Sequence, residues 1–201
     1  MEILILILAY LFGSIPWALV IGKVFYKTDI RNHGSGNLGG SNAGRVLGKK
    51  AGVAVIALDA LKALFSVVLA KTLNMSDTIC VLAGLMCCVG HCFPIFANFK
   101  GGKAVATTVG FVIGISVLIT HEFMIMSLIP IITFFVVLKT TKYVSLSSMI
   151  AIGMAAVCAF IAQDNLVISL SITVLWLFVC YRHKANIGRL LKGNETKITW
   201  M

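Results

Sequence analysis

The sequence predicts an all-α integral membrane protein with seven transmembrane helices, its N-terminus outside the cell and its C-terminus in the cytoplasm. The first observation is composition: of 201 residues, 59% are hydrophobic and 12% are charged, and the mean hydropathy is +1.00. A soluble domain carries about 25% charged residues. The second observation is a series of apolar runs of membrane length, and the third is a one-sided distribution of cations in the loops between them. We therefore expect residues 1–201 to form a single transmembrane domain.

Seven apolar runs can be traced along the chain. They cover 3–22, 51–70, 78–97, 104–120, 123–138, 143–161 and 166–181. A membrane-spanning helix needs about 17–25 residues, so the shortest runs are expected to extend into the polar residues beside them. The first run follows Glu2 rather than a cation and is long, which favours a retained helix over a cleaved signal peptide. All six cysteines lie inside runs, where we expect free, buried thiols.

The lysines and arginines lie almost entirely on one side of this topology. Of the 17, 15 fall in the loops 23–50, 98–103, 139–142 and 182–201, which alternate with nearly cation-free loops. Cytoplasmic loops carry the excess of Lys and Arg, so these four are expected to face the cytoplasm. The net charge of +10 fits attraction either to anionic lipid headgroups or to an anionic substrate. No nucleic-acid partner is expected, because the chain has no soluble binding module.

The first cytoplasmic loop is rich in glycine and in neutral hydrogen-bond donors. Between His33 and Gly48 it contains six glycines, interleaved with Ser35, Asn37, Ser41, Asn42 and Arg45. Glycines such as Gly36 let the backbone approach an anion, and the polar side chains add donors, so this mixture favours a phosphate site. The alternative is a helix-packing strip, because glycines recur every four residues from Gly36 to Gly48. The dinucleotide-like spacing of the glycines is a weak signal, because no strand can precede it.

The second cytoplasmic loop ends in Lys100-Gly101-Gly102-Lys103, directly before a helix expected to begin near Ala104. The N-terminus of a helix attracts anions through its free N–H groups and its dipole. Thr107 and Thr108 add hydroxyls one turn into that helix. The alternative is a basic membrane anchor with a flexible hinge.

Three further groups of polar residues lie in or beside the apolar runs. Asp59 and Lys62 share one helix face and are either functional or a self-neutralising ion pair. His91, at the inner end of the third run, is expected to bind a neighbouring loop or a substrate rather than a metal, because only cysteines accompany it. The third group opens the sixth run and follows the seventh: Ser145, Ser147, Ser148, His183 and Asn186. His183 and Asn186, three residues apart, face together if the tail is helical.

The segments "GSGNLGGSNAGR", "GHCFPIFANFKGGKAVAT", "SLSS" and "RHKANIGRLLKGNE" resemble the motifs of the bacterial acyl-phosphate:glycerol-3-phosphate acyltransferase family. The resemblance covers nearly the whole chain, with the motifs in order and on one membrane face. It implies a seven-helix enzyme of the bacterial inner membrane whose active site faces the cytoplasm. This enzyme would transfer a fatty acyl group from acyl phosphate to the sn-1 hydroxyl of glycerol 3-phosphate, giving lysophosphatidate for phospholipid synthesis.

The resemblance also implies roles for particular residues. The catalytic set is Ser35, Arg45, Lys103, His183 and Asn186. The substrate-binding set is Gly36, Asn37, Ser41, Asn42, His91, Lys100, Gly101, Gly102, Thr107, Ser147 and Ser148. Family members usually have glycine where this chain has Ala104. That change is benign if the residue has a negative φ and remodels the loop if φ is positive.

An acyl phosphate is already activated, so we expect no cofactor, no metal and no covalent nucleophile. Correct placement of the two substrates can supply about 7–11 kcal/mol of the barrier. Ser35, Asn42 and backbone N–H groups are candidate donors to the oxyanion. The base is expected to be glycerol 3-phosphate itself, whose second pKa is near 6, with His183 as the rival. No oligomer is implied.

Two other classes of function remain open from the sequence. A transporter or flippase for phosphorylated or lipid anions would share the basic inner loops, but it needs a polar path through the bilayer. Apart from Asp59 and Lys62, the runs show no series of ionisable side chains that crosses the bilayer. A structural membrane protein would leave the four polar motifs unexplained.

Overall fold

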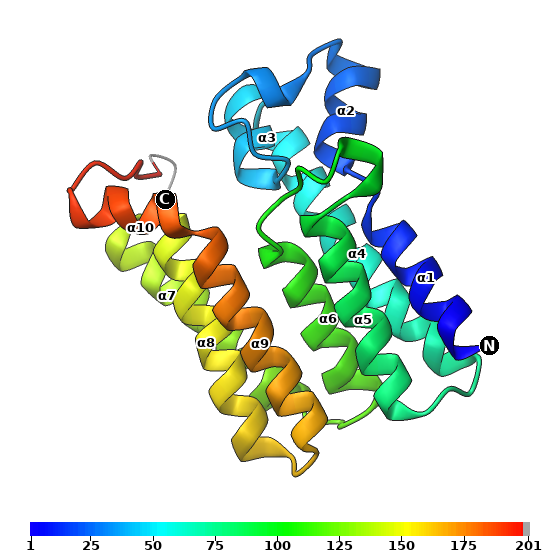
Figure 1. Cartoon of the computed structure of the whole chain (residues 1–201). Helices are drawn as coiled ribbons and strands as arrows, with labels where there is room; N and C mark the ends of the chain where they lie inside the picture. Colours follow the sequence, from blue (N-terminus) through cyan, green and yellow to red (C-terminus); the bar gives the residue numbers. More distant parts are fainter. Residues whose placement is uncertain (199–201) are drawn as a thin grey trace. The chain divides into compact units, whose positions relative to one another are not determined.

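A computed structural model describes residues 1–198, and all regular structure in this range is helical, without strands (Figure 1). The first helices are α1 (Glu2–Gly13), α2 (Trp17–Tyr26), α3 (Gly40–Val46), α4 (Lys49–Thr72), α5 (Asp77–Cys92) and α6 (Val105–Leu118). They are followed by α7 (Ile129–Thr141), α8 (Val144–Ala162), α9 (Leu166–Arg182) and α10 (Lys184–Leu191). Short turns are the 3₁₀ helices η1 (Ile30–Asn32) and η2 (Ile95–Ala97) and the π-helical η3 (Met124–Leu128). The predicted all-α class is confirmed.

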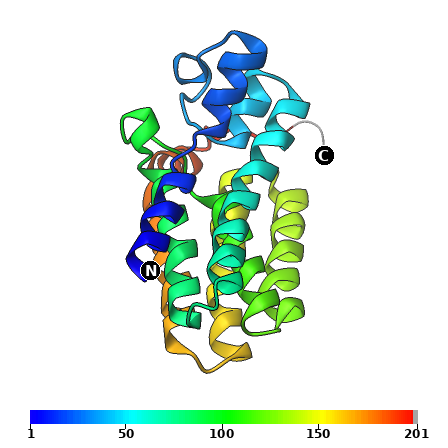
Figure 2. The ribbon, with the colours of Figure 1, turned by 90° about the vertical axis from the view of Figure 1, so that its right-hand side faces the viewer.

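The chain forms two compact units, Met1–Gly114 and the residues from Ile115 onward. In the first unit, α1 packs against α5 and α4, and α4 also packs against α3 (Figure 1, Figure 2). In the second unit, α8 packs between α7 and α9. The grouping of residues 1–201 into one domain stays a prediction.

Four helical segments are long and apolar enough to cross a membrane. They are Lys49–Thr72, Asp77–Ala97, Met124–Thr141 and Val144–Ala162. Two bent pairs, α1 with α2 and α9 with α10, raise the number to six if each pair counts as one span. Helix α6 is apolar but shorter, and it coincides with the predicted run 104–120. The described chain thus has four to six candidate spans, and the number seven and the orientation stay predictions.

The first apolar run is not the single helix that the sequence predicts. It is broken between α1 and α2, whose axes differ by 43°. Pro16 lacks an N–H donor, and its ring clashes with the carbonyl four residues earlier, so an unbroken helix is unfavourable there. The hydroxyl of Ser14 donates to Tyr10 O at 2.8 Å and closes the end of α1. The carbonyl oxygen of Ile15, inside the bend, accepts a hydrogen bond from Lys62 Nζ at 3.1 Å.

Glycines bring several helices into backbone contact within the first unit. A Cβ on Gly13 of α1 would meet the backbone of Cys87 in α5, and a Cβ on Gly110 of α6 would meet the backbone of Ala60 in α4. Small residues at helix contacts are typical of membrane proteins, because they let the backbones approach closely. The six cysteines are free, and only Cys180 is not fully buried.

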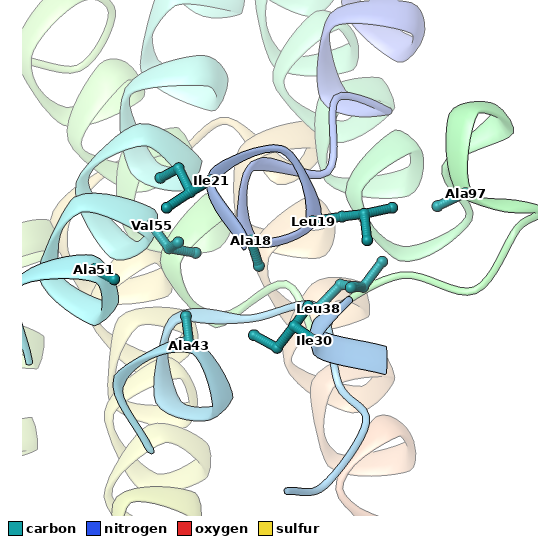
Figure 3. Packing of buried hydrophobic residues seen from close by; sticks show 9 residues of the cluster. All are labelled: Ala18, Leu19, Ile21, Ile30, Leu38, Ala43, Ala51, Val55 and Ala97. Atoms are coloured by element: carbon teal, nitrogen blue, oxygen red, sulfur yellow. The ribbon is translucent and has the colours of Figure 1, made fainter. Parts of the chain in front are cut away.

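One apolar cluster supports both glycine-containing loops of the first unit (Figure 3). Its buried members are Ala18, Leu19, Ile21, Ile30, Leu38, Ala43, Ala51, Val55 and Ala97. Ile30 and Leu38 come from the loop between α2 and α3, and Ala97 comes from η2 in the next loop. Apolar burial, worth about 25 cal/mol per Å², therefore fixes both loops to α2 and α4.

Candidate functional site

The first loop, residues 28–39, is held in shape by the buried side chain of Asn42. Asn42 lies in α3 and is 2% exposed. Its Oδ1 accepts the backbone N–H of Ser35 at 2.9 Å. Its Nδ2 donates to the carbonyl oxygens of His33 at 3.1 Å and Ile30 at 3.4 Å. Both the oxygen and the nitrogen of the Asn42 amide are thus hydrogen-bonded to the loop backbone. A direct contact of Asn42 with substrate stays a prediction.

Helix α3 presents the other predicted polar residues of this motif on its outer face. Ser41 and Arg45 are exposed, whereas Asn42 between them is buried. Residues four apart share a helix face, so the hydroxyl of Ser41 and the guanidinium of Arg45 lie on the same face of α3. Ser35 is also exposed, and Asn37 is half-buried. The motif therefore combines one structural amide with several accessible donors.

The glycines of the first motif have two different uses. Gly40 and Gly44 approach the backbone of Gly52 in α4: a Cβ on Gly40 would be too close to the Gly52 carbonyl, and a Cβ on Gly52 would be too close to Gly44. This is the helix-packing alternative, and it applies to these two glycines. Gly34 and Gly36 lie in the loop with φ of 59° and 68°, a region that residues with a Cβ rarely adopt.

The second loop docks its glycine pair on the C-terminal end of α5. The N–H of Gly101 donates to Cys92 O at 3.1 Å, and that of Gly102 donates to His91 O at 3.1 Å. A Cβ on Gly101 would meet the His91 carbonyl, and a Cβ on Gly102 would meet the His91 ring. These two N–H groups bind protein carbonyls, and a phosphate contact through the side chains of Lys100 or Lys103 stays a prediction.

Three residues around this turn have a left-handed backbone although they are not glycine. They are Asn98, Phe99 and Ala104, with φ of 53°, 58° and 61°. Ala104 is fully buried directly before α6, and its carbonyl accepts the hydroxyl of Thr107 at 3.0 Å. Its positive φ is the unfavourable case that the sequence left open. A Cβ in this region costs roughly 1–2 kcal/mol, so the turn is strained at Ala104.

The two loops meet around a polar cavity of about 350 Å³. It is lined by Arg31, Asn32, Gly36, Ala97, Asn98 and Lys100. Arg31 binds Asp29 through hydrogen bonds of 2.9 and 2.6 Å, which hold the pKa of the Asp29 carboxyl well below its usual range. Within residues 1–198, neither Lys100 nor Arg45 has an ion-pair partner. The cavity thus brings together predicted residues of both loops, Gly36 and Lys100, and Lys100 is a cation without a carboxylate partner within residues 1–198.

His91 is turned into the protein. It is 6% exposed, and its Nδ1 lies 3.0 Å from Lys62 Nζ and 3.4 Å from Asp59 Oδ1. Asp59 and Lys62 form an ion pair at 2.9 Å, which was one of the two alternatives left open by the sequence. Among the residues that the structure describes, no three His, Cys, Asp or Glu side chains are grouped to hold a metal ion. His91 thus belongs to a buried charged cluster beneath the glycine turn.

In the second unit, Glu195 joins one polar side chain of α8 to two of α10. Its Oε1 accepts Asn186 Nδ2 at 2.7 Å and Ser145 Oγ at 2.8 Å, and its Oε2 accepts Arg189 Nε at 2.7 Å. Burial acts to raise the pKa of Glu195, but these hydrogen bonds together bring that pKa below its ordinary value. Sequence reasoning did not assign Glu195 to the site. The sequence feature that could have indicated its role is that Glu195 is the single carboxylate among the cations of residues 182–198.

Ser147 and Ser148 are buried at the start of α8, and their hydroxyls bind the helix itself. Ser147 Oγ donates to Tyr143 O at 2.8 Å, and Ser148 Oγ donates to Val144 O at 2.7 Å. Hydroxyls bound to the carbonyl four residues earlier keep their lone pairs as acceptors. Both residues therefore offer acceptors rather than donors, and their contact with substrate stays a prediction.

His183 occupies the bend between α9 and α10. These helices differ in direction by 59°, and His183 is the residue before α10, with Asn186 three positions on. Its Nδ1 lies 2.8 Å from Val179 O. A carbonyl oxygen only accepts, so Nδ1 carries the proton, and Nε2 of the neutral ring is the basic nitrogen. The tail is helical here, as the predicted pairing of His183 with Asn186 requires.

An apolar groove of about 460 Å³ runs between α8 and α9. It extends from Met149 and Cys180 to Phe160, and Gly153 widens it opposite Trp176. Met149 directly follows the serine pair, so one end of the groove adjoins the polar residues of this unit.

The predicted site residues therefore form two groups, each described within its own unit. The first unit contributes both glycine-containing loops with Ser35, Arg45 and Lys103. The second contributes His183 and Asn186. Their joining in one site stays a prediction.

Comparison with known protein families gives one consistent match. A family model described as glycerol-3-phosphate acyltransferase matches residues 3–193. A glycerol-3-phosphate acyltransferase of Geobacillus kaustophilus (strain HTA426) is 47% identical, over 100% of this chain and 98% of that relative. A protein of Bacillus anthracis named glycerol-3-phosphate acyltransferase 2 is also 47% identical, over 98% of this chain and 100% of that relative.

Two crystal structures of PlsY (YgiH), an integral membrane glycerol 3-phosphate acyltransferase, have a similar fold. The glycerol 3-phosphate form has a TM-score of 0.90 and 36% identity, covering 98% of this chain and 96% of that chain. The lysophosphatidic acid form has a TM-score of 0.87 and 35% identity, covering 98% and 95%. The similarity therefore includes all the segments described above.

Proposed function

The chain belongs to the glycerol-3-phosphate acyltransferase family, and we propose that it transfers a fatty acyl group from acyl phosphate to the sn-1 hydroxyl of glycerol 3-phosphate. The products are lysophosphatidate and inorganic phosphate. The chain is an integral membrane protein, and we place its site at the cytoplasmic face of a bacterial inner membrane. In this proposal residues 1–201 act as one domain of seven spans, with the N-terminus outside.

The structural observation that carries this proposal is the polar cavity between the two loops of the first unit. It offers Lys100 without a carboxylate partner, and the neighbouring elements supply Arg45 and Lys103. Both substrates carry a phosphate group, and two such anions repel each other. Cations and helix-end donors reduce that repulsion, so the substrates can be held close together.

The chemistry requires one bond to form and one to break. The sn-1 oxygen attacks the acyl carbon, its proton passes to a base, and the bond from the acyl carbon to the phosphate oxygen then breaks. Phosphate leaves readily, so no covalent intermediate with the enzyme is needed. Ser35, held by Asn42, is the candidate donor to the oxyanion that forms at the acyl carbon. Placement of the reactants can supply about 7–11 kcal/mol of the barrier.

The base has two candidates. The phosphate of glycerol 3-phosphate has a second pKa near 6, so it can accept the proton of its own hydroxyl group at neutral pH. His183 is the rival, because its Nδ1 donates to Val179 and its Nε2 is left basic. We favour the substrate as base, with Asn186 and His183 orienting it.

The acyl chain is assigned to the apolar groove between α8 and α9. The groove has a volume of about 460 Å³, and its lining includes Met149, the residue after Ser148, and Cys180, three residues before His183. In this arrangement the chain stays among apolar side chains while the reacting carbonyl lies at the polar end.

The test uses purified protein in detergent with acyl phosphate and labelled glycerol 3-phosphate, and with acyl-CoA in a parallel reaction. Lysophosphatidate is expected from acyl phosphate only. Product from acyl-CoA alone would overturn the assignment of the donor. If no product forms and reconstituted vesicles instead take up the labelled anion, the transporter reading replaces the proposed one.

A further inference from the structure

The first unit contains a buried cluster of three ionisable side chains that the proposed reaction does not use. Asp59 is 2% exposed, Lys62 is 1% exposed and His91 is 6% exposed. Lys62 Nζ lies 2.9 Å from Asp59 Oδ1, 3.0 Å from His91 Nδ1 and 3.1 Å from the carbonyl oxygen of Ile15. The ammonium group thus forms an ion pair with Asp59 and lies within hydrogen-bond distance of Ile15 O and His91 Nδ1. Ionisable groups inside a membrane protein are costly and are commonly tied to function.

Two groups lie next to Nδ1 of His91: Lys62 Nζ at 3.0 Å and Asp59 Oδ1 at 3.4 Å. An ammonium nitrogen can only donate, so Nδ1 is the acceptor in the shorter contact. That contact favours a neutral ring with its proton on Nε2 over a ring that donates from Nδ1 to Asp59. Asp59 balances the charge of Lys62, so the cluster as a whole is neutral. A neutral cluster can be buried without the large cost of an unpaired charge.

His91 also contacts the glycine turn directly, through its backbone carbonyl and its ring. Gly102 donates its N–H to the His91 carbonyl at 3.1 Å, and its α-carbon lies so close to the ring that a Cβ would meet Nε2. Gly101 binds the next carbonyl of α5 in the same way. Lys103 follows directly in the chain. A shift of the His91 ring would therefore move Gly102, and with it the backbone of Lys103.

We propose that Asp59 and Lys62 are positioning residues for glycerol 3-phosphate binding. They hold His91 as the Nε2–H tautomer in a fixed orientation, and the glycine turn on that ring places Lys103 against the substrate phosphate. This inference rests on the proposed function, because it assigns a role to Lys103 in binding that substrate. It assigns no proton transfer to the cluster.

The decisive variant removes both charges together. Replacing a buried ion pair with apolar residues of similar size is often neutral or stabilising, so Asp59→Leu with Lys62→Met is expected to keep its thermal stability in detergent. Its kcat/KM for glycerol 3-phosphate is expected to fall about 10- to 100-fold, because a misplacement of 1 Å has effects of that size. The loss is expected mainly as a higher KM. A stable double variant with an unchanged KM would overturn the proposal.

The matched control is the exposed ion pair of the same unit. Lys71 Nζ lies 2.8 Å from Asp77 Oδ1, with both side chains more than two-fifths exposed. The double change Lys71→Met with Asp77→Leu removes the same kinds of charge from the same unit. It is expected to leave KM and kcat unchanged. A KM increase as large as that of the buried double variant would show a general effect of lost charge and would overturn the positioning role.

A spectroscopic measurement tests the tautomer without any activity assay. The chain has four histidines, so protein labelled with ¹⁵N-histidine gives few signals, and His91→Asn identifies the one from His91. The wild-type His91 ring is expected to be neutral with its proton on Nε2 at neutral pH, and Lys62→Met is expected to abolish this preference. A wild-type ring that is protonated, or that carries its proton on Nδ1, overturns the proposal. Absence of lysophosphatidate formation by the wild type would instead reject the proposed function, and the tautomer would still be measured.

Discussion

Asn42 fixes the backbone at Ser35: its buried Oδ1 accepts the Ser35 N–H at 2.9 Å while its Nδ2 binds the carbonyl of His33. The exposed Ser35 hydroxyl therefore stands on a backbone tied to α3. Arg45 lies on the same helix, so the two predicted catalytic groups of the first loop share one support.

Asn42→Ala is expected to loosen the loop around Ser35. The change leaves a backbone donor and two carbonyl groups without their partner, which costs about 1–3 kcal/mol for an unsatisfied buried group. We expect lower thermal stability in detergent together with lower kcat/KM. Asn165→Ala is the control, because Asn165 caps α9 by accepting the N–H of Val167 at 3.0 Å. The control is expected to lose stability only. An Asn42→Ala protein with wild-type kcat/KM would contradict the supporting role.

Ala104→Gly is expected to stabilise the protein by about 0.5–1 kcal/mol. Relief of the left-handed backbone is worth roughly 1–2 kcal/mol, and the greater freedom of glycine in the unfolded chain offsets about 0.4–1 kcal/mol of it. Thermal unfolding in detergent measures the effect. Ala106→Gly, inside α6, is the matched control and is expected to destabilise by about 1 kcal/mol. A lower melting temperature for Ala104→Gly would mean that no strain is stored at this residue.

The helices were predictable because the membrane imposes strong constraints on sequence. Apolar runs of sufficient length and one-sided cations located the helices α4, α5 and α8 closely. The break at Pro16 was visible in the sequence, but the apolar run continues through it and hid the bend. The first compact unit depends on the packing of α1 against α5, which lie far apart in the sequence, and no local pattern encodes that contact.

Replacement of His183 by Asn and by Gln tests the identity of the base. If glycerol 3-phosphate is its own base, both variants are expected to retain turnover within about tenfold and to keep the pH profile of kcat/KM. Loss of a general base costs about 10²–10⁴-fold. A loss in that range in both variants, together with a changed pH profile, would assign the proton transfer to His183 Nε2.

Glu195→Gln is expected to weaken the second unit in a pH-dependent way. The pKa of the Glu195 carboxyl is below its ordinary value of 4.5 in the folded protein, so its ionised form stabilises the fold above that pH. This contribution is lost as the pH falls through the folded pKa. The wild type is therefore expected to unfold at higher temperature than the variant at neutral pH, and the difference is expected to shrink in acid. A difference that stays constant with pH would exclude the carboxylate as its origin.

Arg45→Gln is expected to lower kcat/KM for glycerol 3-phosphate roughly 10- to 150-fold, the equivalent of one charge-assisted hydrogen bond worth about 1.5–3 kcal/mol. Steady-state kinetics measure the effect, and thermal unfolding checks the fold. Lys49→Gln, a nearby exposed cation at the start of α4, serves as the control for net charge. Equal losses in both variants would show that general charge, and not Arg45 itself, attracts the substrate.

The candidate site was predictable in its residue types but less so in their tasks. Glycine, serine and cations in the polar loops indicated a phosphate site, and Gly36 and Lys100 do line one cavity. The sequence did not reveal that Gly101 and Gly102 donate to α5, because that depends on where α5 ends in space. Glu195 was missed for the same reason, since its partner Ser145 lies fifty residues away.

The carboxylate that Asn186 binds is supplied nine residues later in the chain. Ser145, in α8, reaches Asn186, in α10, only through that carboxylate. A chain that ends just before Glu195 would therefore contain every described helix of this unit without the contact that ties Asn186 to Ser145.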